Sequence, residues 1–156
     1  MSPIRNIGII GGGQLARMLS MACADLGLCV HIYCPEKDCP AAQVSNSMTN
    51  GDYTDKKKLR KFSKSLDILT YEFENIDTVG LKEIQKDITI YPPVESLEIA
   101  QDRYLEKSFL QSLGIRTVPF YKIDNSLELE LLLKRKKKQF ILKTRRFGYD
   151  GKGQVR

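Results

Sequence analysis

Residues 6–18 of the chain read NIGIIGGGQLARM, an apolar run that leads through three glycines into an amphipathic stretch. The run predicts a strand over residues 6–10, and apolar residues at helical spacing from Leu15 to Leu26 predict a helix that Gly27 ends. Glycines before a helix N-terminus allow a phosphate to approach the backbone, although a tight strand–helix turn requires them as well. This strand–turn–helix unit indicates an α/β fold.

The same alternation continues up to residue 91. We expect strands at residues 29–33, 66–73 and 88–91, a loop between Pro35 and Asp55, and helices that begin at Asp55 and Thr78. Strands that alternate with helices over short connections indicate a parallel sheet covered on both faces. Residues 1–95 are therefore predicted to form a Rossmann-like domain.

Residues 96–156 are predicted to begin a second domain. The pattern favours helices near residues 102–113 and 126–138, strands at 117–123 and 140–144, and a glycine-rich turn over 148–153. A strand begins at residues 154–155, and the sequence shows no partner for it. We therefore expect this domain to be interrupted.

Composition excludes several classes of protein. The chain has 156 residues, of which 42% are hydrophobic and 28% charged, so it is not wholly disordered. It contains neither an apolar run of about 18 residues, as a membrane span needs, nor a secretory signal, and we expect a cytoplasmic protein. Four cysteines without a C-x-x-C pair favour reduced, packed thiols over a metal site.

Charge is distributed unevenly along the chain. Residues 1–100 hold 11 Lys and Arg against 13 Asp and Glu, whereas residues 101–156 hold 14 against 6. An excess of +8 in the second part suits an anionic partner such as nucleotide phosphates, a nucleic acid or a membrane surface. The basic run at residues 134–138 is also typical of a solvated helix C-terminus.

A second glycine-rich segment, GYDGKGQ, occupies residues 148–154. Its backbone amides suit a flap that closes over a polyphosphate. Lys143 ends the preceding strand, where a fixed ammonium can meet phosphate oxygens. A strand lysine followed by a glycine flap is typical of a nucleotide clamp.

Two carboxylates mark the end of another predicted strand. Glu72 and Glu74 lie two residues apart and therefore on one face, at the carboxyl end of the sheet where ligands bind in α/β folds. They suit a ligand hydroxyl or amine, or they are simply solvated.

Four segments together carry a resemblance to a known family. Residues 11–18 (GGGQLARM), 70–75 (TYEFEN), 101–103 (QDR) and 143–154 (KTRRFGYDGKGQ) resemble the 5-(carboxyamino)imidazole ribonucleotide synthases, the ATPase subunits of phosphoribosylaminoimidazole carboxylase in the ATP-grasp superfamily. The resemblance implies a pre-ATP-grasp Rossmann-like domain followed by the truncated start of an ATP-grasp domain. It also implies carboxylation of 5-aminoimidazole ribonucleotide with ATP and bicarbonate, through carboxyphosphate, in purine biosynthesis.

The resemblance assigns expected roles to individual positions. Gln14, Leu15 and Glu72 would bind the ribonucleotide. Tyr149, Asp150 and Lys152 would lie nearest the imidazole and bicarbonate as catalytic residues. The residues expected at ATP are Arg103, Lys143, Gly148, Tyr149, Asp150, Gly151, Lys152, Gly153 and Gln154.

The same resemblance implies Mg²⁺ with its ligands outside this chain, a homodimer at full length, and an inactive isolated chain without nucleic-acid or membrane partners. Cys34-Pro35 departs from the Asp-Pro common at that strand end, and Lys152 replaces the arginine of some relatives.

Two other functions rest on single features. An NAD(P)-dependent oxidoreductase would use the first glycine loop, but that strand end lacks the acidic residue of a dinucleotide site. A nucleic-acid-binding module would use the basic second part, but no aromatic residues alternate with its lysines and arginines.

Overall fold

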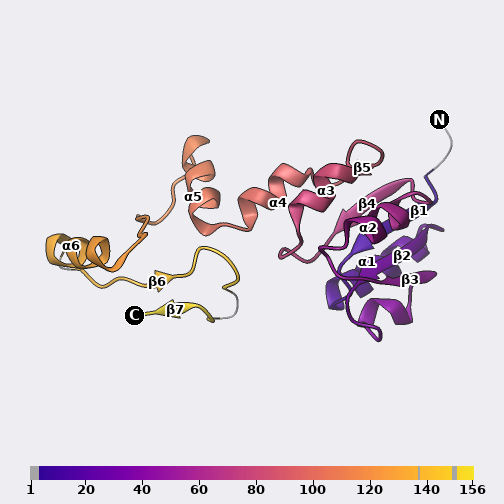
Figure 1. Ribbon diagram of the computed structural model, residues 1–156, viewed down its shortest axis with the longest axis horizontal. Coiled ribbons are helices and arrows are strands. Elements are labelled where there is room, and N and C mark those ends of the chain that lie inside the picture. The colour runs from indigo at the N-terminus through magenta and orange to yellow at the C-terminus, as the bar shows by residue number, and fades with distance from the viewer. Residues whose placement is uncertain (1–3, 137, 149–150) are drawn as a thin grey trace. The chain divides into compact units, whose positions relative to one another are not determined.

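The computed structural model describes residues 4–136, 138–148 and 151–156. The chain forms two compact units, residues 1–98 and 99–156, and each is described by itself. Figure 1 shows the strands and helices of each unit.

Unit 1 is built on a parallel sheet, as the sequence predicts, and the sheet has five strands, one more than expected. Its strands are β1 (Asn6–Ile10), β2 (Cys29–Cys34), β3 (Ser47–Asn50), β4 (Ile68–Tyr71) and β5 (Thr89–Ile90). They lie in the order β3-β2-β1-β4-β5. The chain therefore builds the sheet outward from β1 on one side through β2 and β3, and then on the other side through β4 and β5.

Helices cover both faces of this sheet (Figure 1). Helix α1 (Gln14–Asp25) and the short 3₁₀ helix η1 (Pro40–Gln43) pack with the Ile9 side of the sheet. Helices α2 (Lys56–Ser63), α3 (Thr78–Ile84) and α4 (Val94–Ala100) pack with the Ile10 side. Successive isoleucines of β1 thus serve two separate cores, because side chains alternate across a strand.

Helix α1 packs through its small residues. Ala16 and Ser20 are buried, and the Ser20 hydroxyl donates to the Ala16 carbonyl over 2.8 Å. Leu15 and Met18 are 60% and 56% exposed. The helix predicted from the apolar spacing is confirmed, but its large apolar side chains lie on the face away from the sheet.

Helix caps foreseen from the sequence are present. The Asp55 carboxylate accepts a hydrogen bond from the Lys58 amide at the start of α2. Helix α3 begins at Thr78, as predicted, and Asp77 caps it by accepting from the amides of Val79 and Gly80. Gly27 follows α1 at φ +73°, a conformation that suits glycine.

The loop expected between Pro35 and Asp55 is a partial error, because it contains β3. This strand pairs in parallel with β2 from His31–Ser47 to Cys34–Asn50. Its sequence, SMTN, is polar because it forms the edge of the sheet, so it lacks the apolar run that identifies a central strand.

Unit 2 holds helices α5 (Arg103–Ser112) and α6 (Ser126–Lys136) and an antiparallel pair, β6 (Leu142–Lys143) and β7 (Gln154–Val155). Residues 154–155 therefore have a partner in β6, contrary to expectation. The strand expected at residues 117–123 is wrong, since that segment has no regular structure. Helix α4 was not foreseen after Pro92 and Pro93.

Burial in unit 2 is unusual. Among its described residues, Gln101 and Asp102 are the buried side chains, and every apolar side chain is partly or largely exposed. Polar contacts, rather than buried apolar side chains, therefore hold the described part of this unit together. No helix in the described part of the chain is long and apolar enough to cross a membrane.

The packing of α1 gives a direct test. We expect Ala16→Leu to lower the free energy of unfolding of unit 1 by about 1–3 kcal/mol, because the site is fully buried in a core cluster and a larger side chain would overpack it. Met18→Ala, on the exposed face of the same helix, is the control and is expected to change it by less than about 0.5 kcal/mol. Urea unfolding followed by circular dichroism measures both. A larger loss from Met18→Ala would contradict the assignment of faces.

Candidate functional site

The strand order of unit 1 creates a crevice at the carboxyl ends of β1 and β4. From β1 the chain proceeds to one side of the sheet, and β4 lies on the other side. Loops that leave such neighbouring strands diverge, and ligands of open α/β sheets bind between them. Here the diverging loops carry Gly11–Gly13 after β1 and Glu72 after β4.

Glu72 joins these two loops. Its backbone amide donates to the Ile10 carbonyl over 3.1 Å, and its side-chain Oε1 accepts from the Gly13 amide over 3.0 Å. Gly11 is at φ +115°, and a Cβ there would lie 2.7 Å from the same oxygen. Glycine is therefore required at this position, and a carboxylate already holds the Gly13 amide that a phosphate would seek.

The crevice is an acidic cleft of about 350 Å³. Its lining residues are Gly12, Gly13, Glu36, Asp38, Cys39, Pro40, Tyr53, Glu72 and Phe73. They include three carboxylates, and no lysine or arginine is among those that the structure describes. Such a cleft suits hydroxyl or amine groups and disfavours phosphate.

Aromatic side chains contribute one part of this lining. The rings of Tyr53 and Phe73 lie 5.5 Å apart between centroids. Burial, followed by the charge of Glu36, raises the pKa of the Tyr53 phenol, which therefore stays neutral and able to donate a hydrogen bond. The cleft thus combines a neutral donor, carboxylate acceptors and an apolar ring surface.

Two thiols pack beneath Gly12. A Cβ at Gly12 would lie 2.7 Å from the Cys34 sulfur and 2.6 Å from that of Cys39. Burial and then a hydrogen bond with Cys39 raise the pKa of Cys34 to about 12, so this thiol is protonated at neutral pH. All four cysteines are free, as the sequence predicts. Within the described ranges, no group of three or more His, Cys, Asp or Glu side chains is arranged to hold a metal.

Unit 2 has its own hollow, of about 690 Å³, between the start of α6 and the β6–β7 pair. Lys143, Gly153 and Gln154 line it. The Thr144 amide donates to the Gly153 carbonyl over 2.8 Å and closes the base of the glycine-rich segment. The predicted strand lysine and the last two residues of the predicted flap therefore line the same hollow.

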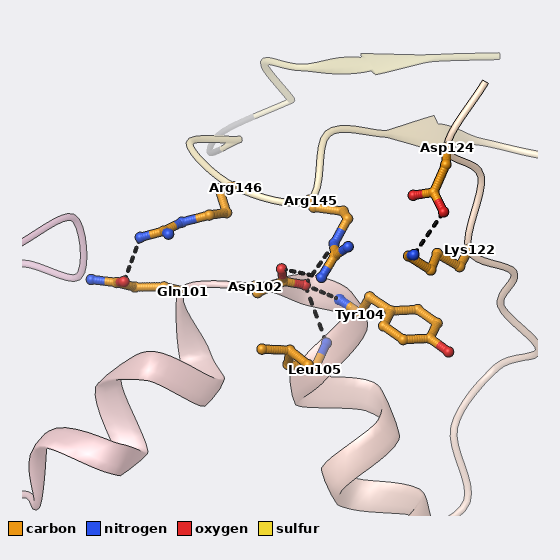
Figure 2. Close-up of polar contacts among 8 residues, drawn as sticks. All are labelled: Gln101, Asp102, Tyr104, Leu105, Lys122, Asp124, Arg145 and Arg146. Carbon is orange, nitrogen blue, oxygen red and sulfur yellow. Dashed lines mark hydrogen bonds and ion pairs between the residues drawn. The ribbon is translucent and has the colours of Figure 1, made fainter. Parts of the chain in front are cut away.

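Figure 2 shows a second set of contacts, between the turn before α5 and the segment after β6. The Asp102 carboxylate caps α5 by accepting from the amides of Tyr104 and Leu105, and it also accepts from Arg145 Nε and Nη2 at 3.1 and 2.5 Å. Burial acts to raise the pKa of Asp102, but the hydrogen bonds from Arg145 and the two amides outweigh it and hold that pKa below its usual value.

Comparison with known families agrees with this geometry. Residues 4–101, more than half of the chain, match the model of the ribonucleotide synthetase preATP-grasp domain. The chain belongs to this family.

Relatives of the preATP-grasp family cover the whole chain. N5-carboxyaminoimidazole ribonucleotide synthase of Brucella melitensis is 45% identical over 156 residues, which is 100% of this chain and 43% of that protein. The crystal structure of the Staphylococcus aureus synthetase with ADP has a TM-score of 0.92 at 38% identity, over 97% of this chain and 40% of its own. The Aspergillus clavatus synthase with ADP and 5-aminoimidazole ribonucleotide has a TM-score of 0.83 at 25% identity, over 100% and 41%.

These findings confirm the resemblance noted in the sequence. The chain spans about two fifths of the length of the relatives that it matches. The parallel sheet of unit 1 likewise confirms the predicted pre-ATP-grasp fold.

The structure places the predicted ribonucleotide-binding residues at one end of the sheet. Glu72 and Gly13 line the cleft, whereas Gln14 and Leu15 follow Gly13 as exposed residues of α1 and are not among its lining. Their roles stay predictions.

The predicted ATP-binding residues gather in unit 2. The guanidinium of Arg103 donates to the Gly148 carbonyl, while Lys143, Gly153 and Gln154 line the hollow. Gly151 and Lys152 are exposed. Tyr149 and Asp150 lie outside the described residues, so their roles also stay predictions.

Several residues of these sites were assigned no role from the sequence. Tyr53 and Asp38 line the acidic cleft, and Asp102, which lies in the quoted segment 101–103, binds Arg145. Asp102 carries one usable signal, since an aspartate directly before a helix is a favoured N-cap. No local pattern identifies Tyr53, because the chain reaches the cleft there through the edge strand β3.

The crowding of Gly11 against Glu72 is testable. We expect Gly11→Ala to lower the free energy of unfolding by more than Gly27→Ala does. Gly27 also has positive φ but has no atom within 4 Å of an added Cβ, so its cost of about 1 kcal/mol is backbone strain alone. Combining Gly11→Ala with Glu72→Ala should recover part of the excess. Equal losses at the two glycines in urea unfolding would contradict the close approach.

Proposed function

We propose that this chain takes part in the ATP-dependent carboxylation of 5-aminoimidazole ribonucleotide, as the N-terminal two fifths of an N5-carboxyaminoimidazole ribonucleotide synthase. The observation that carries the proposal is the Glu72 carboxylate on the Gly13 amide at the sheet's crevice. It makes the cleft suitable for a sugar or an amine. The Aspergillus clavatus relative was crystallised with this ribonucleotide.

Unit 1 would bind the uncharged parts of the ribonucleotide, namely the ribose and the aminoimidazole. The free lone pairs of the Glu72 carboxylate suit the ribose hydroxyls or the exocyclic amine. The Tyr53 and Phe73 rings offer a surface to the imidazole. Among the residues that the structure describes, no lysine or arginine lines the cleft, so we infer that the ribonucleotide phosphate is bound by basic residues elsewhere in the full-length protein.

Unit 2 would hold the nucleotide. Lys143 and Arg103 supply positive charge, and the glycine-rich segment supplies backbone amides that can close over phosphates. Phosphoryl transfer from ATP to bicarbonate depends on such positioning more than on a protein nucleophile. The closed segment would keep water from the carboxyphosphate. Tyr149, Asp150 and Lys152 are proposed nearest the imidazole and bicarbonate.

The described residues do not fit Mg²⁺. Mg²⁺ is bound by carboxylates together with phosphate oxygens, and the buried carboxylate of unit 2, Asp102, is engaged by Arg145. Acidic ligands for the metal are therefore proposed in the remaining part of the relatives' length. We also propose that the full-length protein is a cytoplasmic homodimer.

Ligand binding by unit 1 tests the assignment. We expect 5-aminoimidazole ribonucleotide, titrated calorimetrically into the chain, to bind, and Glu72→Ala to weaken that binding by about tenfold or more, because a hydrogen bond to a charged group is lost. Glu83→Ala is the control, since it removes an exposed carboxylate of α3 that pairs with Lys56.

NADH titrated in parallel separates the alternatives. Binding of NADH without a ribonucleotide signal would refute the purine assignment and favour the oxidoreductase. Absence of ribonucleotide binding would contradict the proposal that the unit 1 cleft holds the ribose and imidazole of the ribonucleotide.

A second test concerns turnover. We expect the 156-residue chain to release no phosphate from ATP in the presence of ribonucleotide and bicarbonate, because the described part of unit 2 buries no apolar side chain and offers no Mg²⁺ site. A coupled assay for ADP, the other product of ATP cleavage, measures this turnover. Turnover that is abolished by Lys143→Ala would show that the chain is catalytically complete.

A further inference from the structure

Asp102 connects two parts of unit 2 that lie 43 residues apart in the sequence. One is the first turn of α5, where its Oδ1 accepts from the Tyr104 and Leu105 amides at 2.9 and 3.2 Å. The other is Arg145, which binds both carboxylate oxygens in a fork (Figure 2). Bidentate pairs of this kind fix the orientation of both side chains.

Neighbouring contacts extend this connection along the backbone. The Arg103 amide donates to the Arg145 carbonyl over 3.0 Å. Arg146 Nη2 donates to Gln101 Oε1 over 2.5 Å, and the Arg103 side chain donates to the Gly148 carbonyl. The segment from Arg145 to Gly148 is thus held at four points by residues 101–103.

Burial distinguishes this ion pair from others on the surface. The Asp102 side chain is 12% exposed and that of Arg145 41%, whereas Glu130 and Lys134 are 65% and 77% exposed with their charges 3.9 Å apart. Exposed pairs contribute little because solvent screens them. Asp102 and Gln101 are also the buried side chains among the described residues of the unit, so the most enclosed part of what is described is this polar contact.

The backbone changes character at the end of the held segment. Phe147 has φ +60°, a left-handed conformation that a bulky side chain rarely adopts. Beyond it, Gly151 and Gly153 have φ of +80° and +67°. The held segment from Arg145 to Gly148, called the arm below, therefore contains one strained residue, Phe147. The glycine-rich residues follow it.

We infer that Asp102 is a positioning residue. Its carboxylate fixes the arm, the segment from Arg145 to Gly148 that leads into the glycine-rich segment, against the start of α5 before any nucleotide binds. Arg103, the next residue, is then directed to Gly148, at the start of the glycine-rich segment that would also bind the nucleotide phosphates. The nucleotide part of this inference rests on the proposed function, whereas the fixed arm does not.

Trypsin cleaves after arginine and therefore reports on the arm, where Asp102 holds the side chain of Arg145 and Gln101 holds that of Arg146. The measured quantity is the rate of cleavage at the Arg146–Phe147 bond relative to that at the Lys152–Gly153 bond, followed by mass spectrometry. Asp102→Asn retains an oxygen for the helix cap and removes the charge. Arg145→Gln leaves the cap intact and removes the other partner. Glu130→Gln, on the exposed pair of α6, is the matched control.

We expect either single change at the pair to raise this ratio about tenfold, as loss of a charge-assisted contact implies. The double variant should equal the single variants, because both remove the same interaction, and Glu130→Gln should leave the ratio unchanged. An unchanged ratio in Asp102→Asn and Arg145→Gln, or independent effects that multiply in the double variant, would overturn the inference.

Adding ADP tests the nucleotide part of the inference separately from the fixed arm. In the original chain, ADP is expected to slow cleavage at Lys152–Gly153, and Asp102→Asn is expected to reduce that protection. Protection that is equal in the two chains would refute the positioning role. If ADP protects neither chain, the proposed nucleotide site of unit 2 is wrong, while the cleavage ratio without ADP still decides whether Asp102 fixes the arm.

Discussion

The contact of the Glu72 carboxylate with the Gly13 amide is the constraint on which the site of unit 1 depends. It joins the loops after β1 and β4, where the order in which the chain adds strands reverses, and it requires glycine at position 11 because any Cβ would meet the carboxylate. It also determines the chemistry of the cleft. A glycine loop at a helix N-terminus ordinarily attracts an anion, but here a protein carboxylate takes that place. The remaining surface is acidic, which suits hydroxyl and amine groups.

Periodicity in the sequence identified elements better than it identified their faces. The helix after Gly13 is present, yet Ala16 and Ser20 pack on the sheet while Leu15 and Met18 are exposed. A helix that lies close to a sheet needs small residues at the contact, and a pattern of apolar residues does not show which stripe has that role. Strand β3 was missed for a related reason, since an edge strand with the sequence SMTN carries no apolar run.

Candidate site residues were predicted from the sequence where they lie at the end of a predicted strand. Glu72 follows a strand, and Lys143 ends one, so position alone indicated both. Tyr53 and the Asp102–Arg145 pair depend on contacts between distant segments, and no local pattern specifies such contacts. The first glycine loop illustrates the same limit: the sequence left phosphate binding and a tight turn both open, because the partner of Gly13 lies 59 residues further along the chain.

Each unit uses a carboxylate to hold a glycine-rich segment, with opposite electrostatic results. In unit 1, Glu72 binds a neutral amide, so its charge remains in the cleft with those of Glu36 and Asp38. In unit 2, Asp102 binds a guanidinium and is neutralised by it, so the positive charges of Lys143 and Arg103 are not offset by this buried carboxylate. This difference accords with the uneven charge of the sequence, −2 in residues 1–100 and +8 in residues 101–156. A carboxylate thus fixes backbone in both units, and the charge of its partner determines whether the nearby surface favours hydroxyl and amine groups or phosphates.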